Sequence, residues 1–191
     1  MFIKSEKKLS PVKRIAVVGI MAATLECGKL ALAVLPNIEV VSLLLALYGY
    51  VFGSLGVLAA LIFCAIEPLI WGFGPWVISY FLYWPFLSLA FCVLSKARGQ
   101  GEDLKREKRF SLPLLPLLLI FVFTLWFGVL TSFVDVGLFT GKLDRFFWRF
   151  GIYYLRGIPF YITHVVSNTL IFAFAFSPLC RIFRRIKARS L

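Results

Sequence analysis

Three different polar chemistries lie along one stripe of the last apolar segment of this 191-residue chain. At about 100° per residue, a helix through this segment places Arg156, Tyr161, His164 and Asn168 on one side. A guanidinium, an imidazole and an amide are very unfavourable against lipid, so the stripe must face a bundle interior or a wet cavity. The pattern predicts a binding pocket, with an interhelical hydrogen-bond network as the alternative.

Aromatic side chains follow a second helical face earlier in the chain. Trp76, Tyr80, Tyr83 and Trp84 recur with i, i+4, i+7 and i+8 spacing. An aromatic belt at the membrane interface explains Trp76, but Trp84 lies about 12 Å deeper along the helix axis. We expect these rings to stack on a flat solute, with ordinary helix packing as the alternative.

Two other places carry polar side chains near these faces. Glu26 and Lys29 are three residues apart, which favours an ion pair between them, although Lys29 could instead reach an anionic group of a solute. In the corner at residues 35–39, Pro36 ends one helix, and the Asn37 side chain can cap the next. Water can solvate Glu39 there, so we expect the corner to form the rim of a pocket rather than its centre.

The composition requires lipid as the main solvent of the chain. Hydrophobic residues make up 61% of it and include 21 Phe, more than a soluble domain of this size could bury. Six apolar segments fit one all-α membrane domain, with spans at residues 12–35, 38–52, 55–70, 76–94, 113–134 and 153–180. One continuous helix over 38–70 is the competing interpretation of the second and third spans.

The positive charge follows the spans and does not indicate nucleic acid. Sixteen of the 21 Lys and Arg residues fall near the N-terminus, in 96–109 and in 181–189. Basic residues beside spans mark the cytoplasmic side and contact anionic lipid, so six helices with both termini in the cytoplasm are expected. The expected parts are a basic N-terminus (1–11), a membrane domain (12–180) with a cytoplasmic loop (96–110) and an outer loop (135–152), and a basic tail (181–191).

Two of these parts have alternative interpretations. The outer loop suits a lid or binding loop, or else an interfacial segment anchored by Phe146, Phe147 and Trp148. The basic start and the apolar run after it imitate a signal peptide. The charges of Glu26 and Lys29 and the renewed apolar pattern argue against cleavage.

Motifs for most enzymatic chemistry are absent from the sequence. It has no HExxH, GxSxG or Walker sequence, and the four Cys residues lack metal-ligand spacing, so neither a metal nor a cofactor is expected. An intramembrane enzyme acting on a lipid or isoprenoid would need a second group beside His164, for which Glu26, Glu39 and Asp135 are candidates. A structural membrane protein is the third hypothesis.

Several strings resemble the substrate-binding S component of energy-coupling factor (ECF) transporters. They are Leu-Pro-Asn-Ile-Glu-Val-Val-Ser-Leu-Leu (35–44), Tyr-Val-Phe-Gly (50–53), Trp-Gly-Phe-Gly-Pro-Trp (71–76), Tyr-Phe-Leu-Tyr-Trp-Pro (80–85) and His-Val-Val-Ser-Asn (164–168). The resemblance implies a prokaryotic plasma-membrane protein that captures a vitamin or similar micronutrient from outside. It also implies partners, namely a transmembrane coupling subunit and two ATPases, and a pocket in the outer halves of the later helices.

Small residues on the first helix complete the expected sites. The Gly19, Ala23, Cys27 and Ala31 stripe permits close approach of another helix. In the family that the strings resemble, such residues meet the coupling subunit, a role that Ala16, Gly19, Ala22 and Ala23 match. The Gly49, Gly53 and Gly56 positions permit a similar approach, and spacing leaves open whether the partner helix is internal.

Overall fold

The computed structural model describes residues 9–98, 114–139 and 144–190. Of these, 89% are helical and none is in a strand, which confirms the all-α prediction. Residues 1–8 of the expected basic N-terminus (1–11), most of the basic loop at 96–110 and residues 140–143 of the outer loop lie outside the described residues.

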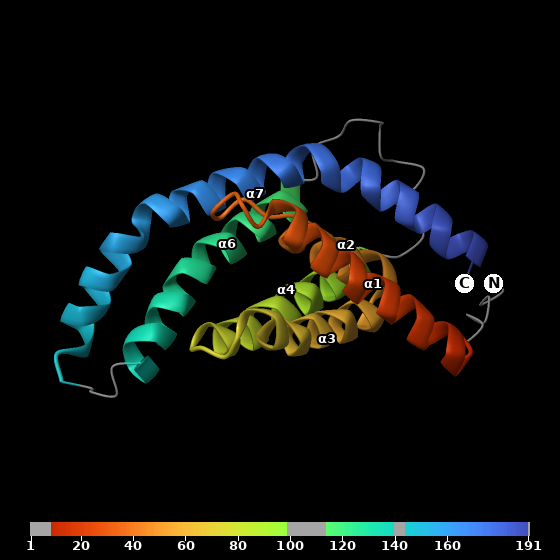
Figure 1. The fold of residues 1–191 in the computed structure, drawn as a ribbon. Helices are drawn as coiled ribbons and strands as arrows, with labels where there is room; N and C mark the ends of the chain where they lie inside the picture. The colour runs from red at the N-terminus through yellow and green to blue at the C-terminus, as the bar shows by residue number, and fades with distance from the viewer. Residues whose placement is uncertain (1–8, 99–113, 140–143, 191) are drawn as a thin grey trace.

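Six α-helices and one short π-helix make up the described fold (Figure 1). Five apolar stretches are long enough to cross a membrane, and they indicate a multi-pass membrane protein. The elements are α1 (Pro11–Leu32), α2 (Val41–Phe52), α3 (Ser54–Trp71), α4 (Trp76–Ala97), α6 (Leu114–Val134), the π-helix η1 (Asp135–Phe139) and α7 (Phe146–Ser190).

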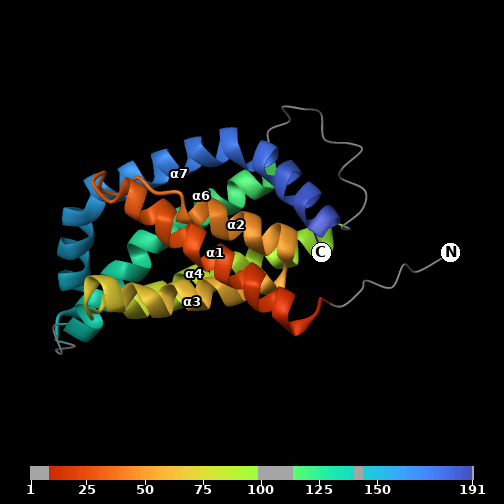
Figure 2. The same ribbon diagram turned by 45° about the vertical axis from the view of Figure 1, so that its right-hand side comes forward.

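The shortest helix, α2, is the centre of the bundle. All of its residues from Val41 to Val51 except Leu44 are buried. A helix that is hydrophobic all round belongs inside a protein, and α2 packs against α1, α3, α4 and α7. Figure 2 shows it between these helices.

The chain reverses between α2 and α3 at Gly53, so the continuous-helix interpretation of 38–70 is wrong. Gly53 has a φ of 65°, a backbone conformation that favours glycine. The two helices then pack closely, because a Cβ on Gly56 would lie 2.4 Å from the backbone carbon of Tyr48. A Cβ on Gly49 would lie 2.0 Å from the carbonyl oxygen of Ser88 in α4. Both glycines therefore serve contacts within the chain.

Most of the small residues of α1, unlike Gly49 and Gly56, are not packed against another described helix. Ala16, Gly19 and Ala23 are exposed, and a Cβ on Gly19 would meet nothing within 4 Å. Ala22, by contrast, is buried against the rest of the bundle. The exposed three leave a shallow face on α1 that no other described helix covers.

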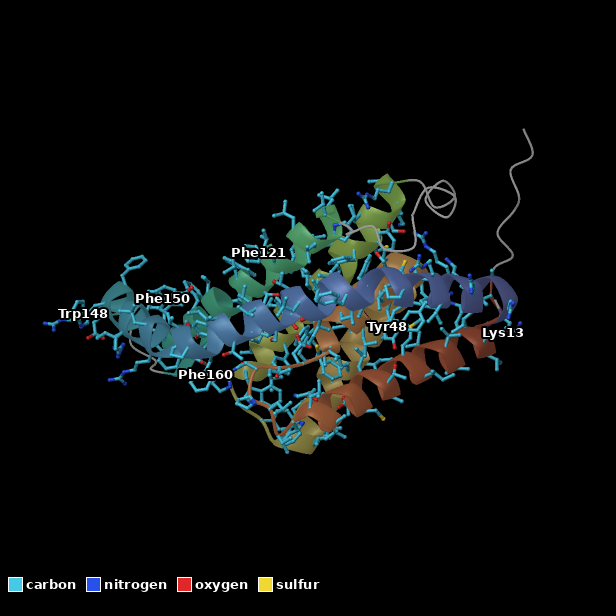
Figure 3. All side chains as sticks on the ribbon, turned by 90° about the horizontal axis from the view of Figure 1, so that it is seen from above. Lys13, Tyr48, Phe121, Trp148, Phe150 and Phe160 are labelled. Carbon is cyan, nitrogen blue, oxygen red and sulfur yellow. The ribbon has the colours of Figure 1, made fainter. Side chains whose placement is uncertain are left out.

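The longest helix, α7, forms an arch across the molecule (Figure 1). It contains Pro159 and Pro178, and proline inside a helix is a common cause of bending. It begins at Phe146, so the described part of the expected outer loop is largely helical, with η1 before it. Figure 3 shows Trp148 projecting from this end, and the residue is 68% exposed.

The other end of α7 lies beside the start of α1, at the same end of the bundle (Figures 1 and 2). Here α7 holds the last turn of α2. Lys187 Nζ donates a hydrogen bond of 2.8 Å to the carbonyl oxygen of Val51, and Arg184 lies 5.3 Å from the ring centroid of Tyr50. The Lys187 hydrogen bond satisfies a carbonyl that the helix end leaves free.

Candidate functional site

A pocket of about 200 Å³ lies where the chain leaves α1, between the 33–40 connection, α4, α6 and α7. The lining combines two kinds of side chain, namely charged or polar groups and aromatic rings. Of the residues predicted for the site, it includes Lys29, Asn37, Glu39, Tyr80, Trp84 and His164, and Phe127 adds a further ring.

The Glu39 carboxylate is where hydrogen-bond donors converge. Its Oε1 lies 2.7 Å from Nδ2 of Asn168 and 3.3 Å from Nε2 of His164. Because a carboxylate oxygen only accepts, both nitrogens are donors. Its Oε2 accepts the backbone N–H of Ser42 at 2.8 Å. One acidic side chain thus ties the α1–α2 connection to α7.

This arrangement differs from the expected role of the corner. Asn37 does not cap α2, whose N-cap residue is Val40; Asn37 has a φ of 59°, and its carbonyl oxygen accepts from Ser167 at 3.2 Å. Glu39 caps the helix instead and is only 17% exposed.

The Lys29 ammonium sits in an aromatic cage on the other side of the pocket. The rings of Phe63, Trp71, Trp76 and Tyr80 have centroids 4.9–5.9 Å from Nζ. The ammonium forms an ion pair with Glu67, whose side chain is fully buried. The expected Glu26–Lys29 ion pair is therefore replaced by a pair that joins α1 to α3.

Glu67 and Phe127 were not predicted from the sequence. Glu67 did leave a signal, because it is a lone carboxylate in the apolar stretch of α3, where an unpaired charge is costly. Phe127 left none, since one phenylalanine among many in an apolar helix has no distinctive spacing.

Three rings make up the aromatic wall of the pocket. The Trp84 ring centroid lies 5.7 Å from that of Tyr80 and 6.0 Å from that of Phe127. Phe127 also meets the His164 ring edge-on at 5.1 Å. The wall is thus continuous from α4 through α6 to α7.

The remaining predicted residues lie behind or away from the lining. Tyr83 is buried against Trp84 and Phe127, and Trp76 packs on Tyr80. Tyr161 fits against Gly128 of α6 and shares a hydrogen bond of 2.7 Å with Ser132. Arg156 is exposed rather than turned into the pocket.

The polar stripe on α7 had two explanations, a pocket lining and an interhelical hydrogen-bond network. Each of them applies to part of the stripe. His164 lines the pocket, whereas Asn168 belongs to the hydrogen-bond network behind it, bonding both Glu39 and Ser42. Among the described residues no group of three or more His, Cys, Asp or Glu side chains is placed to hold a metal ion.

Comparisons with protein-family models, with curated proteins and with solved structures each gave no match. The function is therefore inferred from the arrangement of the pocket.

Proposed function

We propose that this protein is a membrane-embedded solute-capture subunit of the ECF S-component type, without enzymatic activity of its own. The observation that carries the proposal is the pocket itself. Four segments, far apart in the sequence, bring a fixed carboxylate, an imidazole and three aromatic rings to one small cavity. Small-molecule sites typically have aromatic walls and a small number of precisely placed polar groups.

The proposed topology has six spans with both termini in the cytoplasm of a prokaryotic cell. The start of α1 and the end of α7 lie at one end of the bundle, beside basic residues of α7 (Figure 1). The pocket lies at the opposite end of α1, which in this topology faces the outside. A vitamin or similar micronutrient would enter from there.

The first test is native mass spectrometry of the detergent-purified protein. We expect one small molecule to be retained, and Trp84→Ala to reduce the retained fraction more than about tenfold. Truncating a buried aromatic contact typically costs about 2 kcal/mol or more, which corresponds to that loss. Trp148→Ala is the matched control, because Trp148 is exposed and is not part of the pocket lining.

Absence of any retained molecule from the wild-type protein, prepared with and without partners, would contradict the proposal. So would equal retention by the Trp84→Ala and Trp148→Ala variants, because the bound molecule would then lie elsewhere.

A second test concerns the proposed coupling subunit and two ATPases. We expect Gly19→Trp to retain the solute but to lose copurification with these partners, because the bulky ring would stand on the exposed face of α1. Leu118→Trp, on the exposed face of α6, is the control and should copurify normally. Normal copurification of Gly19→Trp would place the partner interface elsewhere.

A second candidate function is an intramembrane enzyme acting on a lipid or isoprenoid. The contact between Glu39 and His164 favours it, since a carboxylate that orients an imidazole is also the arrangement of a general base. Turnover of a lipid substrate that His164→Ala abolishes would support this candidate. Recovery of the retained molecule in chemically unchanged form supports capture.

A further inference from the structure

The charge of Lys29 is already compensated within the protein. Its ammonium pairs with Glu67, a carboxylate with no exposed surface, and four ring faces surround it. Aromatic faces carry partial negative charge and stabilise a cation placed over them. The Lys29 side chain is therefore committed to the α1–α3 contact and leaves no net positive charge for a solute.

The Glu39 carboxylate has a weaker counterpart: its ion-pair contact is with Nε2 of His164 at 3.3 Å, which carries a charge only when the imidazole is protonated. Two of its three hydrogen-bond donors, the Asn168 amide and the backbone N–H of Ser42, are neutral. The third, His164, is also neutral when the imidazole carries its single proton on Nε2, the atom that faces Glu39. In that state the charged groups at the pocket are a balanced Lys29–Glu67 pair and one carboxylate.

Nearby buried groups do not reverse this balance. Glu26, one turn before Lys29, is buried, and neither of its carboxylate oxygens has a hydrogen-bond partner. Whether protonated or ionised, it adds no positive charge. Arg156, which the sequence placed on the polar stripe of the last helix, is exposed outside the lining.

The aromatic wall adds to the same preference. Tyr80, Trp84 and Phe127 line the pocket with centroid separations of 5.7–6.5 Å, so three aromatic rings adjoin one small volume. Aromatic rings next to a carboxylate are the usual chemistry for holding a nitrogen cation.

We propose that the captured solute carries a positively charged nitrogen, a protonated amine or quaternary ammonium, bound between the Glu39 carboxylate and the rings of Tyr80, Trp84 and Phe127. This inference rests on the proposed function and specifies its substrate class. It replaces the alternative in which Lys29 reaches an anionic group of the solute, because the Lys29 ammonium is paired with Glu67.

Three probes of similar size and different charge test the substrate class. They are benzylamine (a cation at the chosen pH), benzyl alcohol (neutral) and benzoate (an anion). Binding to the purified wild-type protein is measured by calorimetry at about pH 8, where an alkylamine keeps its proton. We expect benzylamine to bind at least about tenfold more tightly than either of the others. Benzoate binding most tightly, equal binding of all three, or binding of none would overturn the inference.

Two variants test whether the Glu39 carboxylate causes the preference for benzylamine. Glu39→Gln keeps the shape and removes the charge, so the advantage of benzylamine should fall to about twofold or less. Asp135→Asn removes a carboxylate outside the pocket, one that accepts from Tyr153 at 3.1 Å, and should keep the full advantage. An undiminished advantage in Glu39→Gln would overturn the assignment. If that variant does not fold, the ranking of the three probes by the wild-type protein decides.

The charge of the natural solute separates this inference from the proposed function. A cationic molecule found by native mass spectrometry supports both. A neutral or anionic one would leave solute capture standing and overturn the substrate class. No retained molecule would overturn both.

Discussion

Replacing Lys29 by Met is expected to destabilise the folded protein by about 3–5 kcal/mol, which is the usual cost of breaking a buried ion pair. The variant leaves Glu67 with no exposed surface and no cation, and Oε1 of Glu67 already lacks a hydrogen-bond partner. The reverse change, Glu67→Met, should cost less, because the Lys29 side chain is 23% exposed and can reach water. Thermal unfolding in detergent measures both.

The double variant Lys29→Met with Glu67→Met should recover most of the loss, since an apolar pair of similar volume can replace a buried ion pair at little cost. Lys96→Met, at the exposed end of α4, is the control and should behave like the wild type. A Lys29→Met variant of full stability, or a double variant no better than it, would show that the ion pair does not join α1 to α3 as described.

The second large effect on stability is expected from adding one methyl group at Gly49. The Cβ of Gly49→Ala would stand 2.0 Å from the Ser88 carbonyl oxygen, and that atom belongs to the α4 backbone. Relief requires α2 and α4 to separate at the centre of the bundle. We expect a loss above the usual range of about 1–3 kcal/mol for overpacking, seen as a low yield of monodisperse protein and a lower unfolding temperature.

Gly19→Ala is the matched control for this prediction. Both glycines lie inside helices, but a Cβ at Gly19 meets nothing within 4 Å. The change should be neutral or stabilise the fold by up to about 1 kcal/mol, because alanine favours the helix. If Gly49→Ala unfolded at the wild-type temperature, or Gly19→Ala lost as much as Gly49→Ala, the close α2–α4 contact would be contradicted.

The helices were largely predictable because lipid leaves a strong signal in composition. Apolar runs of about 20 residues located the long helices, and Gly53 was visible as a weak break between α2 and α3. The start of α7 was missed. Aromatic and charged residues after Phe146 suggested a loop, although these residues can also form a helix at the membrane surface.

The site was predictable on one helix but not across helices. Periodicity placed His164 and Asn168 on an inward face, and both lie inward. It also placed Arg156 there, but the projection assumes a straight helix, and Pro159 lies between Arg156 and His164. Spacing along the sequence can identify ion-pair partners only within one helix. It therefore selected Glu26 for Lys29, while the actual partner, Glu67, is 38 residues away.

The continuity of α7 has a mechanical consequence. His164 at the pocket and Lys187 at the Val51 carbonyl are about 35 Å apart along one hydrogen-bonded helix, by the rise of 1.5 Å per residue. Their separation is set by the pitch of that helix and not by packing between neighbours. A displacement of α7 along its axis therefore acts at both ends of the bundle, except for the part taken up by bending at Pro178, the one proline between His164 and Lys187.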